Sequence, residues 1–209
     1  MNLDLSVYLV IGAQSVGARG VIATVNAAVR GGVGAVQLRD KRASGRELVS
    51  IAGQLLDALD GTSVPLLIND RLDVALAAGA NGVHLGHADV GAQSARRLAG
   101  PDFLVGLSVS SAEELAEVDA LPPGTVDYLG IGPVFPTSTK SDAAAALGLD
   151  TVATLRGRTK LPCVGIGGIN RHNAPSVWAA GLDGLAVVSA ICDDADPRAA
   201  ALALRNTRP

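Results

Sequence analysis

The sequence predicts a (β/α)8 barrel, the TIM-barrel fold, built as a single domain over residues 1–209. Apolar runs of strand length recur eight times along the chain, and helical stretches lie between them. Hydrophobic residues make up 48% of the chain but aromatic residues only 2%, so Ala, Val, Leu and Ile must form the core. Such a composition is typical of parallel sheets that are covered by helices.

The eight strands are expected, in chain order, at Val7–Ile11, Ala35–Leu38, Pro65–Ile68, Gly82–Leu85, Phe103–Leu107, Val126–Ile131, Cys163–Ile166 and Gly184–Val188. A doubly wound open sheet is the alternative for alternating strands and helices. That fold usually has a glycine-rich fingerprint after its first strand, which Ile11-Gly12-Ala13-Gln14 does not provide. No linker or low-complexity segment divides the chain, and Ala143–Ala146 is only a short alanine run.

Helix boundaries are marked between these runs. Ser44 with Glu47 forms a capping-box pattern, and Ser111 with Glu114 repeats it. The first of these patterns precedes an apolar helix face at Leu48, Ile51, Leu55 and Leu59. Glycine ends one earlier helix and an Asp-Pro pair opens the last, at Gly31-Gly32 and Asp196-Pro197.

Composition also excludes several classes of protein. A net charge of −3 argues against a nucleic-acid partner, because phosphate backbones select basic surfaces. Cys163 and Cys192 are too few for a disulfide scaffold or a zinc cluster, and we expect both to be buried. The first residues, with Asp4, do not resemble a signal peptide, and no apolar run is long enough to span a membrane. We therefore expect a cytoplasmic protein. The sequence does not distinguish a monomer from a homo-oligomer.

Residues Gln37-Leu38-Arg39-Asp40-Lys41 end the second expected strand. Side chains alternate along a strand, so Gln37, Arg39 and Lys41 should share one face while Leu38 and Asp40 point away. Two cations and an amide on one strand face are costly to bury without an anionic partner. The pattern predicts a pocket for a negatively charged ligand.

Polar residues gather at the other strand ends as well, where barrel enzymes place their chemistry. In chain order they are Gln37, Arg39, Lys41, Asn69, Asp70, His84, His87, Asp89 and Ser108, followed by the segments Gly132–Lys140, Gly165–Ile169 and Ser189–Ala190. His84 lies just inside the fourth strand and is expected to be a hydrogen-bonded core residue. His87 and His172 lie in loops without a Cys or a second His at metal-binding spacing, and a catalytic histidine is not expected.

Asp70 and Asp89 follow neighbouring strands, so their carboxylates should approach each other beside Arg39 and Lys41. This arrangement suits Mg²⁺, which prefers one or two carboxylates together with phosphate oxygens and water. Each residue has a structural alternative: Asp70 as the cap of a helix at Leu72–Ala78, and Asp89 as a turn residue.

Two further segments suit phosphate. Gly165–Ile169 and Gly184–Ala190 follow strands seven and eight, where many barrels hold phosphate on backbone N–H groups. Thr137-Ser138-Thr139-Lys140 lies in the longest connection and predicts a lid over an anion, with a polar surface loop as the alternative.

A set of motifs extends over nearly the whole chain: Gln37-x-Arg39-x-Lys41, Asn69-Asp70, Gly82-Val83-His84-Leu85-Gly86 with Asp89, Gly106-x-Ser108, Asp127-Tyr128-x-Gly130-x-Gly132-Pro133, Thr137-x-Thr139-Lys140, Gly165-Ile166-Gly167-Gly168-Ile169 and Val188-Ser189-Ala190-Ile191. The combination resembles the thiamine phosphate synthase (thiamin-phosphate pyrophosphorylase) family. The resemblance implies a transferase that joins 4-amino-5-hydroxymethyl-2-methylpyrimidine diphosphate to a thiazole phosphate, or its carboxylate, and releases pyrophosphate.

The resemblance also implies roles. Asp70 and Asp89 would hold Mg²⁺, and Gln37 would meet the pyrimidine. The diphosphate would be met by Arg39, Lys41, Asn69, Ser108 and Lys140, of which Arg39, Lys41, Ser108 and Lys140 are the expected catalytic residues. The thiazole phosphate would be held by Thr137, Thr139, Gly168 and the backbone of Ser189 and Ala190.

The chain departs from the family pattern at three places. Asp40 replaces a frequent Glu, His87-Ala88 replaces Gln-Glu, and Ser110 replaces a frequent His. One alternative is the related thiazole tautomerase, whose proton shuttle would be the histidine that Ser110 replaces. A second alternative is a non-catalytic barrel that binds a phosphate ligand, which fold alone does not exclude. The retained Asp pair and Thr137-x-Thr139-Lys140 favour the synthase.

Overall fold

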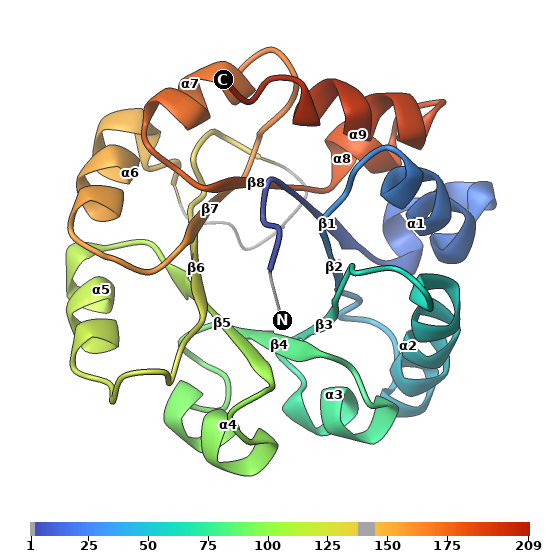
Figure 1. Cartoon of the computed structure of the whole chain (residues 1–209), viewed down its shortest axis with the longest axis horizontal. Coiled ribbons are helices and arrows are strands. Elements are labelled where there is room, and N and C mark those ends of the chain that lie inside the picture. Colours follow the sequence, from blue (N-terminus) through green and yellow to red (C-terminus); the bar gives the residue numbers. More distant parts are fainter. Residues whose placement is uncertain (1–2, 138–144) are drawn as a thin grey trace.

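The computed structural model describes residues 3–137 and 145–209, and it confirms the predicted barrel. Eight parallel strands close in sequence order, and helices surround them on the outside (Figure 1). The strands are β1 (Val7–Ile11), β2 (Ala35–Leu38), β3 (Leu66–Asn69), β4 (Gly82–Leu85), β5 (Leu104–Val109), β6 (Tyr128–Ile131), β7 (Cys163–Ile166) and β8 (Gly184–Val187). The alternative open sheet is wrong, because β8 pairs with β1 and closes the ring.

The helices are α1 (Val21–Arg30), α2 (Gly45–Leu59), α3 (Leu72–Ala78), α4 (Ala92–Ala99), α5 (Ala112–Asp119), α6 (Gly148–Gly157), α7 (Ala174–Ala179), α8 (Ser189–Cys192) and α9 (Pro197–Arg205). Two 3-10 turns, η1 (Ala13–Ser15) and η2 (Gly17–Arg19), follow β1 and were not predicted. Among the described residues, none of these helices is long and apolar enough to cross a membrane.

The predicted helix caps are present. Ser44 and Glu47 bond reciprocally at the start of α2, and the Asp196 carboxylate accepts two backbone N–H groups at the start of α9. At α5, Ser111 accepts the N–H of Glu114 as expected, but the Glu114 carboxylate accepts the N–H and hydroxyl of Ser110 instead of closing the box. This difference places Glu114 at the edge of the site described below.

The core has two layers. Side chains on the outer faces of the strands pack against the helices in one large cluster, which includes the buried Cys163 and Cys192. A smaller cluster fills the inside of the barrel and includes Tyr8, Leu67 and Tyr128. Leu5 joins this inner cluster and Leu3 packs against it, and Figure 1 shows the segment before β1 crossing the middle of the ring. The barrel is therefore closed at the end where its strands begin.

One hydrogen-bonding arrangement occurs three times at that closed end, immediately before β4, β6 and β8. Asn81, Asp127 and Asp183 each accept, through a side-chain oxygen, the backbone N–H of a residue at the start of the preceding strand. Their own backbone N–H groups donate to the carbonyl of that same residue. The two acidic members also pair with an arginine of the helix before that preceding strand, Asp127 with Arg96 of α4 and Asp183 with Arg156 of α6. Three strand pairs are thus joined in one register by short polar side chains.

Candidate functional site

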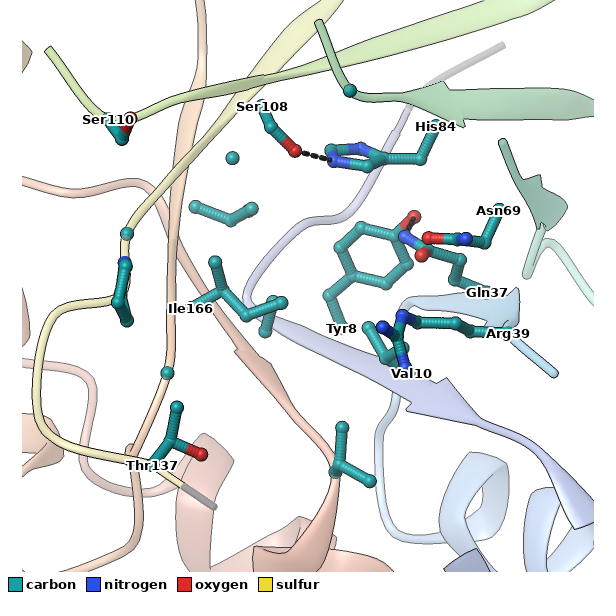
Figure 2. A pocket seen from close by; sticks show the side chains of 18 of the residues that line it. Tyr8, Val10, Gln37, Arg39, Asn69, His84, Ser108, Ser110, Thr137 and Ile166 are labelled. Atoms are coloured by element: carbon teal, nitrogen blue, oxygen red, sulfur yellow. Dashed lines mark hydrogen bonds between the residues drawn. The ribbon is translucent and has the colours of Figure 1, made fainter. Parts of the chain in front are cut away.

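A cavity of about 430 Å³ opens where the strands end, and all eight strands contribute residues to its wall. Figure 2 shows Gln37, Arg39 and Asn69 reaching into it from one side, and Ile166 and Thr137 lying on the other. The predicted site residues that line it are Gln37, Arg39, Lys41, Asn69, Asp70, Asp89, Ser108, Thr137, Gly168 and Ser189. Ala190 packs against the outer core instead, and Thr139 and Lys140 lie outside the described residues.

Strand alternation at the end of β2 is as predicted. Gln37, Arg39 and Lys41 line the cavity. Asp40 points away and accepts the backbone N–H groups of Ala13, Arg42 and Ala43. Asp40 therefore holds the loop that carries Lys41, while its neighbours face the cavity.

Asp70 is the one described non-glycine residue with a positive φ, 62°. The alternative interpretation of Asp70 as a helix cap is wrong, because the cap position of α3 is Arg71. The left-handed backbone turns the Asp70 carboxylate into the cavity, where Oδ2 lies 4.0 Å from Nζ of Lys41. Backbone conformations of this kind are costly and gather at functional sites.

Asp89 does close a turn, because its Oδ2 accepts the N–H of Gly86 at 2.7 Å. It also stands close enough to Asp70 to act on it. Burial raises the pKa of the Asp70 carboxyl, and the neighbouring Asp89 carboxylate raises this pKa further, against the opposing effect of Lys41. Two like charges held together in this way suit a divalent cation between them.

The donor set also fits the kind of metal that was expected. In the part of the chain that the structure describes, no three His, Cys, Asp or Glu side chains converge on one point. Two carboxylates alone are insufficient for a structural zinc site. They are what Mg²⁺ uses when it takes its remaining ligands from phosphate and water.

The loops after β6 and β7 form the opposite wall of the cavity. Val134 donates its N–H to the Ile166 carbonyl at 2.8 Å, and Phe135 donates to Gly167 at 3.1 Å. Gly168 has a φ of 65°, and a Cβ there would stand 2.6 Å from the Pro136 carbonyl oxygen. Only glycine allows this close approach of the two loops.

Several lining residues were given no role in the site by the sequence, and they come from inside the barrel. Tyr8, His84 and Ile166 line the inner part of the cavity, with Val10 and Val164. His84 bonds the Tyr128 hydroxyl through Nδ1 at 2.9 Å and the Ser108 hydroxyl through Nε2 at 3.0 Å. Burial lowers the pKa of His84 to about 4. The expectation of a hydrogen-bonded core histidine is confirmed, although its ring also faces the site.

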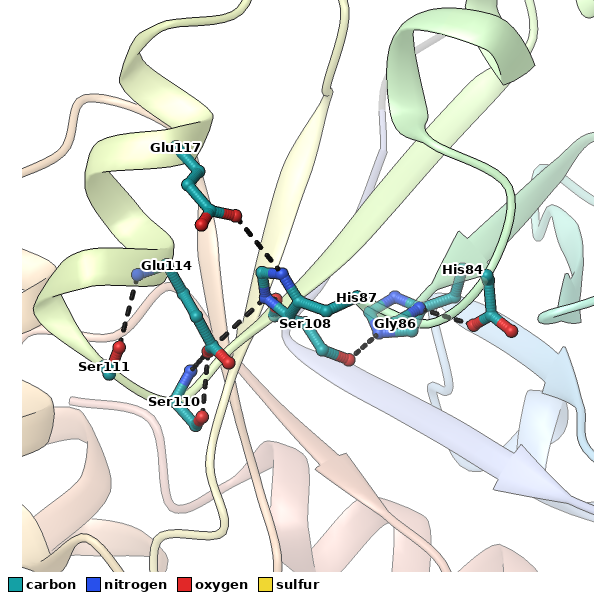
Figure 3. Close-up of polar contacts among 9 residues, drawn as sticks. His84, Gly86, His87, Ser108, Ser110, Ser111, Glu114 and Glu117 are labelled. Atoms are coloured by element: carbon teal, nitrogen blue, oxygen red, sulfur yellow. Dashed lines mark hydrogen bonds and ion pairs between the residues drawn. The ribbon is translucent and has the colours of Figure 1, made fainter.

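His87, one of the departures from the family pattern, is turned toward α5 (Figure 3). Its Nε2 lies 3.1 Å from the Ser108 carbonyl oxygen and 3.4 Å from Oε2 of Glu114, and its Nδ1 lies 3.6 Å from Oε2 of Glu117. Glu114 in turn accepts the Ser110 hydroxyl at 2.8 Å. The imidazole of His87 thus stands beside Ser110 and links β5 to α5.

Comparison with known proteins gives a consistent result. The family model described as "Thiamine monophosphate synthase" matches residues 7–191. A thiamine-phosphate synthase from Azorhizobium caulinodans is 48% identical over 202 residues, which cover 97% of this chain and 94% of the relative. One from Xanthobacter autotrophicus is 50% identical with the same coverage. A solved thiamine phosphate pyrophosphorylase from Pyrococcus furiosus superimposes with a TM-score of 0.86 at 36% identity, covering 98% of this chain and 96% of that one.

The matched region includes all eight strands and every described residue that lines the cavity. The solved relative shares the barrel over nearly its full length. From sequence and structure together, the chain belongs to the thiamine monophosphate synthase family.

Proposed function

We propose that this protein is a thiamine-phosphate synthase, which joins an aminopyrimidine methyl diphosphate to a thiazole phosphate and releases pyrophosphate. One observation carries the proposal beyond family membership. Two carboxylates, Asp70 and Asp89, meet two cations, Arg39 and Lys41, at the rim of a cavity whose inner wall is largely apolar. Such a site fits a flat ring below and a diphosphate above.

The inner part of the cavity would bind the pyrimidine. Tyr8, Val10 and Ile166 offer apolar contacts, and the side chain of Gln37, only 3% exposed, offers a polar one. The diphosphate would then lie at the rim beside Arg39, Lys41, Asn69 and Ser108, which all line the same opening. Lys140, expected to meet the same group, lies outside the described residues.

The reaction needs little from the protein except electrostatic stabilisation. As the diphosphate leaves, the 4-amino group of the pyrimidine donates electrons to the ring and stabilises positive charge on the exocyclic CH₂. The thiazole nitrogen then attacks this carbon with its own lone pair, so no protein nucleophile is required. Arg39, Lys41 and the Ser108 hydroxyl stabilise the negative charge that develops on the leaving group. The apolar wall keeps water away from the reactive carbon.

Mg²⁺ held by Asp70 and Asp89 would neutralise diphosphate charge when bound. The two carboxylates would thereby place the diphosphate on the side of the cavity opposite the β6 and β7 loops. The thiazole phosphate would bind on the side of these loops, where Thr137, Gly168 and Ser189 line the cavity. The backbone of Ala190, and Thr139 outside the described residues, are also expected to contact it. The two substrates therefore approach each other across the mouth of the cavity.

A pyrophosphate-release assay tests the proposal. Purified protein is supplied with both substrates, with either one alone, and with Mg²⁺ or EDTA. Release that needs both substrates and the metal, with thiamine phosphate as the organic product, is expected. Lys41→Ala should reduce turnover at least about tenfold, because one preorganised contact to the leaving group is lost. Arg42→Ala, on the same loop but outside the cavity wall, is the matched control and should keep wild-type turnover.

Two results would contradict the proposal. Absence of release in folded protein that still binds thiazole phosphate would favour the tautomerase or a binding-only barrel. Release without any organic coupling product would indicate a hydrolase.

A further inference from the structure

A line of five hydrogen-bonded side chains crosses the barrel at the base of the cavity. Gln37 Nε2 lies 2.8 Å from the Tyr8 hydroxyl, and the Tyr8 hydroxyl lies 2.8 Å from that of Tyr128. The Tyr128 hydroxyl lies 2.9 Å from Nδ1 of His84, whose Nε2 lies 3.0 Å from Oγ of Ser108. The line uses both tyrosines of the chain. We call these five residues the relay.

Hydrogen-bond chemistry fixes the direction of the relay once its first member is placed. Gln37 donates its amide N–H to Tyr8. Tyr8 is 1% exposed, so its own O–H needs an internal acceptor, and the Tyr128 oxygen is within reach. Tyr128 has a single proton, which must then go to Nδ1 of His84. His84 consequently has its proton on Nε2 and donates it to Ser108.

This direction decides what each end of the relay presents to the cavity, because Gln37 and Ser108 both line it. Ser108 accepts from His84, so its own proton is available for donation into the cavity. The Gln37 amide nitrogen is engaged with Tyr8, so its carbonyl oxygen is available to accept. If the relay ran the other way, Ser108 would give its proton to His84 and Gln37 would present N–H groups.

We propose that Tyr128 and His84 are positioning residues that hold the Ser108 hydroxyl as a hydrogen-bond donor and the Gln37 carbonyl as an acceptor. The roles of these two groups toward substrates rest on the proposed function. A donor at Ser108 suits an anionic diphosphate oxygen, and an acceptor at Gln37 suits the 4-amino group of the pyrimidine. One line of bonds thereby sets the polarity of both contacts.

The barrel reserves space for the middle of the relay. A Cβ at Gly106 of β5 would stand 2.2 Å from the Tyr128 ring, and a Cβ at Gly130 of β6 would stand 3.0 Å from the His84 ring. Tyr128 is fully buried and belongs to the inner core cluster, whereas the cavity wall begins at Tyr8 and His84. Removing its hydroxyl therefore interrupts the relay without changing a residue of the wall.

The tautomer of His84 is the direct test, and it needs no activity. In ¹⁵N-labelled wild-type protein at neutral pH, a protonated and an unprotonated ring nitrogen resonate far apart. The chain has three histidines, and loss of one signal set in His84→Gln identifies the relevant one. We expect His84 as a single Nε2–H tautomer in the wild type and a mixture in Tyr128→Phe. A wild-type His84 with its proton on Nδ1 would overturn the proposal.

A kinetic cycle provides the second test. Ser108→Ala should lower kcat about a hundredfold through loss of one donor to the leaving group, and Tyr128→Phe about tenfold through misorientation of that donor. In the Ser108→Ala background, Tyr128→Phe should cost less kcat than it does in the wild type, because the Ser108 hydroxyl that it orients is gone and only the Gln37 contact remains to be affected. Additive losses would show that Tyr128 has a merely structural role and would overturn the proposal.

The control is Thr125→Val, which removes a buried hydroxyl that donates to the Pro122 carbonyl, outside the relay. It should lower stability as Tyr128→Phe does, yet leave kcat and the His84 tautomer unchanged. His84→Gln retains an N–H near Ser108, whereas His84→Asn does not, so kcat should be higher in the Gln variant. If wild-type protein released no pyrophosphate, the proposed function would be wrong, while the tautomer measurement would still decide the direction of the relay.

Discussion

At the scale of single residues, Asp70 joins two unfavourable features: a left-handed backbone and a like-charged neighbour. Asparagine adopts that backbone conformation readily and has the same shape as aspartate. Asp70→Asn therefore isolates the charge. Mg²⁺-dependent pyrophosphate release should fall at least about tenfold, because one of the two carboxylates proposed to hold the metal is lost. Thermal stability should be equal or higher, since the repulsion with Asp89 is removed.

The measurement is the release rate as a function of Mg²⁺ concentration, together with thermal unfolding. Asp73→Asn is the control, because Asp73 lies nearby on α3 but its carboxylate is engaged by Arg71 at the surface. Wild-type rate and wild-type Mg²⁺ dependence in Asp70→Asn would show that this carboxylate has no part in metal binding.

His84 predicts a dependence of stability on pH. Burial lowers its pKa from 6.5 to about 4, while the Asp89 charge acts weakly in the opposite direction. Its other neighbours are the neutral hydroxyls of Tyr128 and Ser108. Between these two pKa values, the unfolded chain binds a proton on His84 that the folded chain does not. The contribution of His84 to the free energy of unfolding is therefore complete above pH 6.5 and is lost as pH falls toward 4. The loss is about 3 kcal/mol.

Urea unfolding at pH 7 and pH 4.5 tests this prediction. His84→Gln should be less stable than the wild type at pH 7, because the relay is interrupted, but should lose less stability on acidification. An equal loss in both proteins would assign the pH dependence to the carboxylates instead.

At the scale of elements, the sequence predicts the strands well wherever apolar runs coincide with the barrel wall. The bounds of β1, β2, β4 and β7 are as predicted. The strand β5 was predicted to end at Leu107 but continues to Val109, because the polar Ser108 faces the cavity and does not interrupt the pairing with β6. β6 was predicted from Val126 but begins at Tyr128. The other two differ by a single residue at one or both ends.

The residues of the candidate site likewise fall into a predictable group and an unpredictable one. Residues just after a strand, such as Arg39 and Asp70, were predictable because strand alternation and the shared barrel end determine where they lie. The relay was not predictable, because its members come from five strands and meet only across the closed barrel. Nothing in the sequence around Tyr8 or Tyr128 distinguishes a hydroxyl that bonds its partner from an ordinary core aromatic.

The polar residues before β4, β6 and β8 lead to a prediction about stability alone. Asp183→Ala leaves the buried N–H of Cys163 without its acceptor, and we expect the free energy of unfolding to fall by about 2 kcal/mol. Asp183→Asn keeps an acceptor oxygen, as Asn81 does naturally before β4, and loses only the exposed ion pair with Arg156. That variant should lose less than about 1 kcal/mol.

Chemical denaturation of both variants measures this difference, and steady-state assays should show unchanged kcat and KM, because Asp183 lies at the end of the barrel away from the site. Equal destabilisation by Ala and Asn would mean that Asp183 stabilises the fold through the ion pair and not through its hydrogen bond to the backbone.

At the scale of the whole molecule, the barrel separates stability from chemistry along its axis. Leucines and short polar side chains close one end, and the cavity with its charged rim occupies the other. The relay lies between the two, where an apolar core would otherwise continue. Polar side chains in this layer are acceptable because each is bonded: among the described residues, no buried side-chain nitrogen or oxygen lacks a partner.

The closure formed by Leu3 and Leu5 has a kinetic consequence. A barrel sealed at one end has a single entrance, and with the proposed sites the pyrimidine at Gln37 would lie below the thiazole phosphate at Gly168 and Ser189. The pyrimidine diphosphate would therefore enter first, and the thiazole phosphate, arriving second, would block its exit. A non-reactive thiazole phosphate analogue should accordingly inhibit uncompetitively against the pyrimidine diphosphate, whereas mixed inhibition would indicate random entry. The coupled product would occupy both sites, so a new turnover would begin only after the product has left through the same opening.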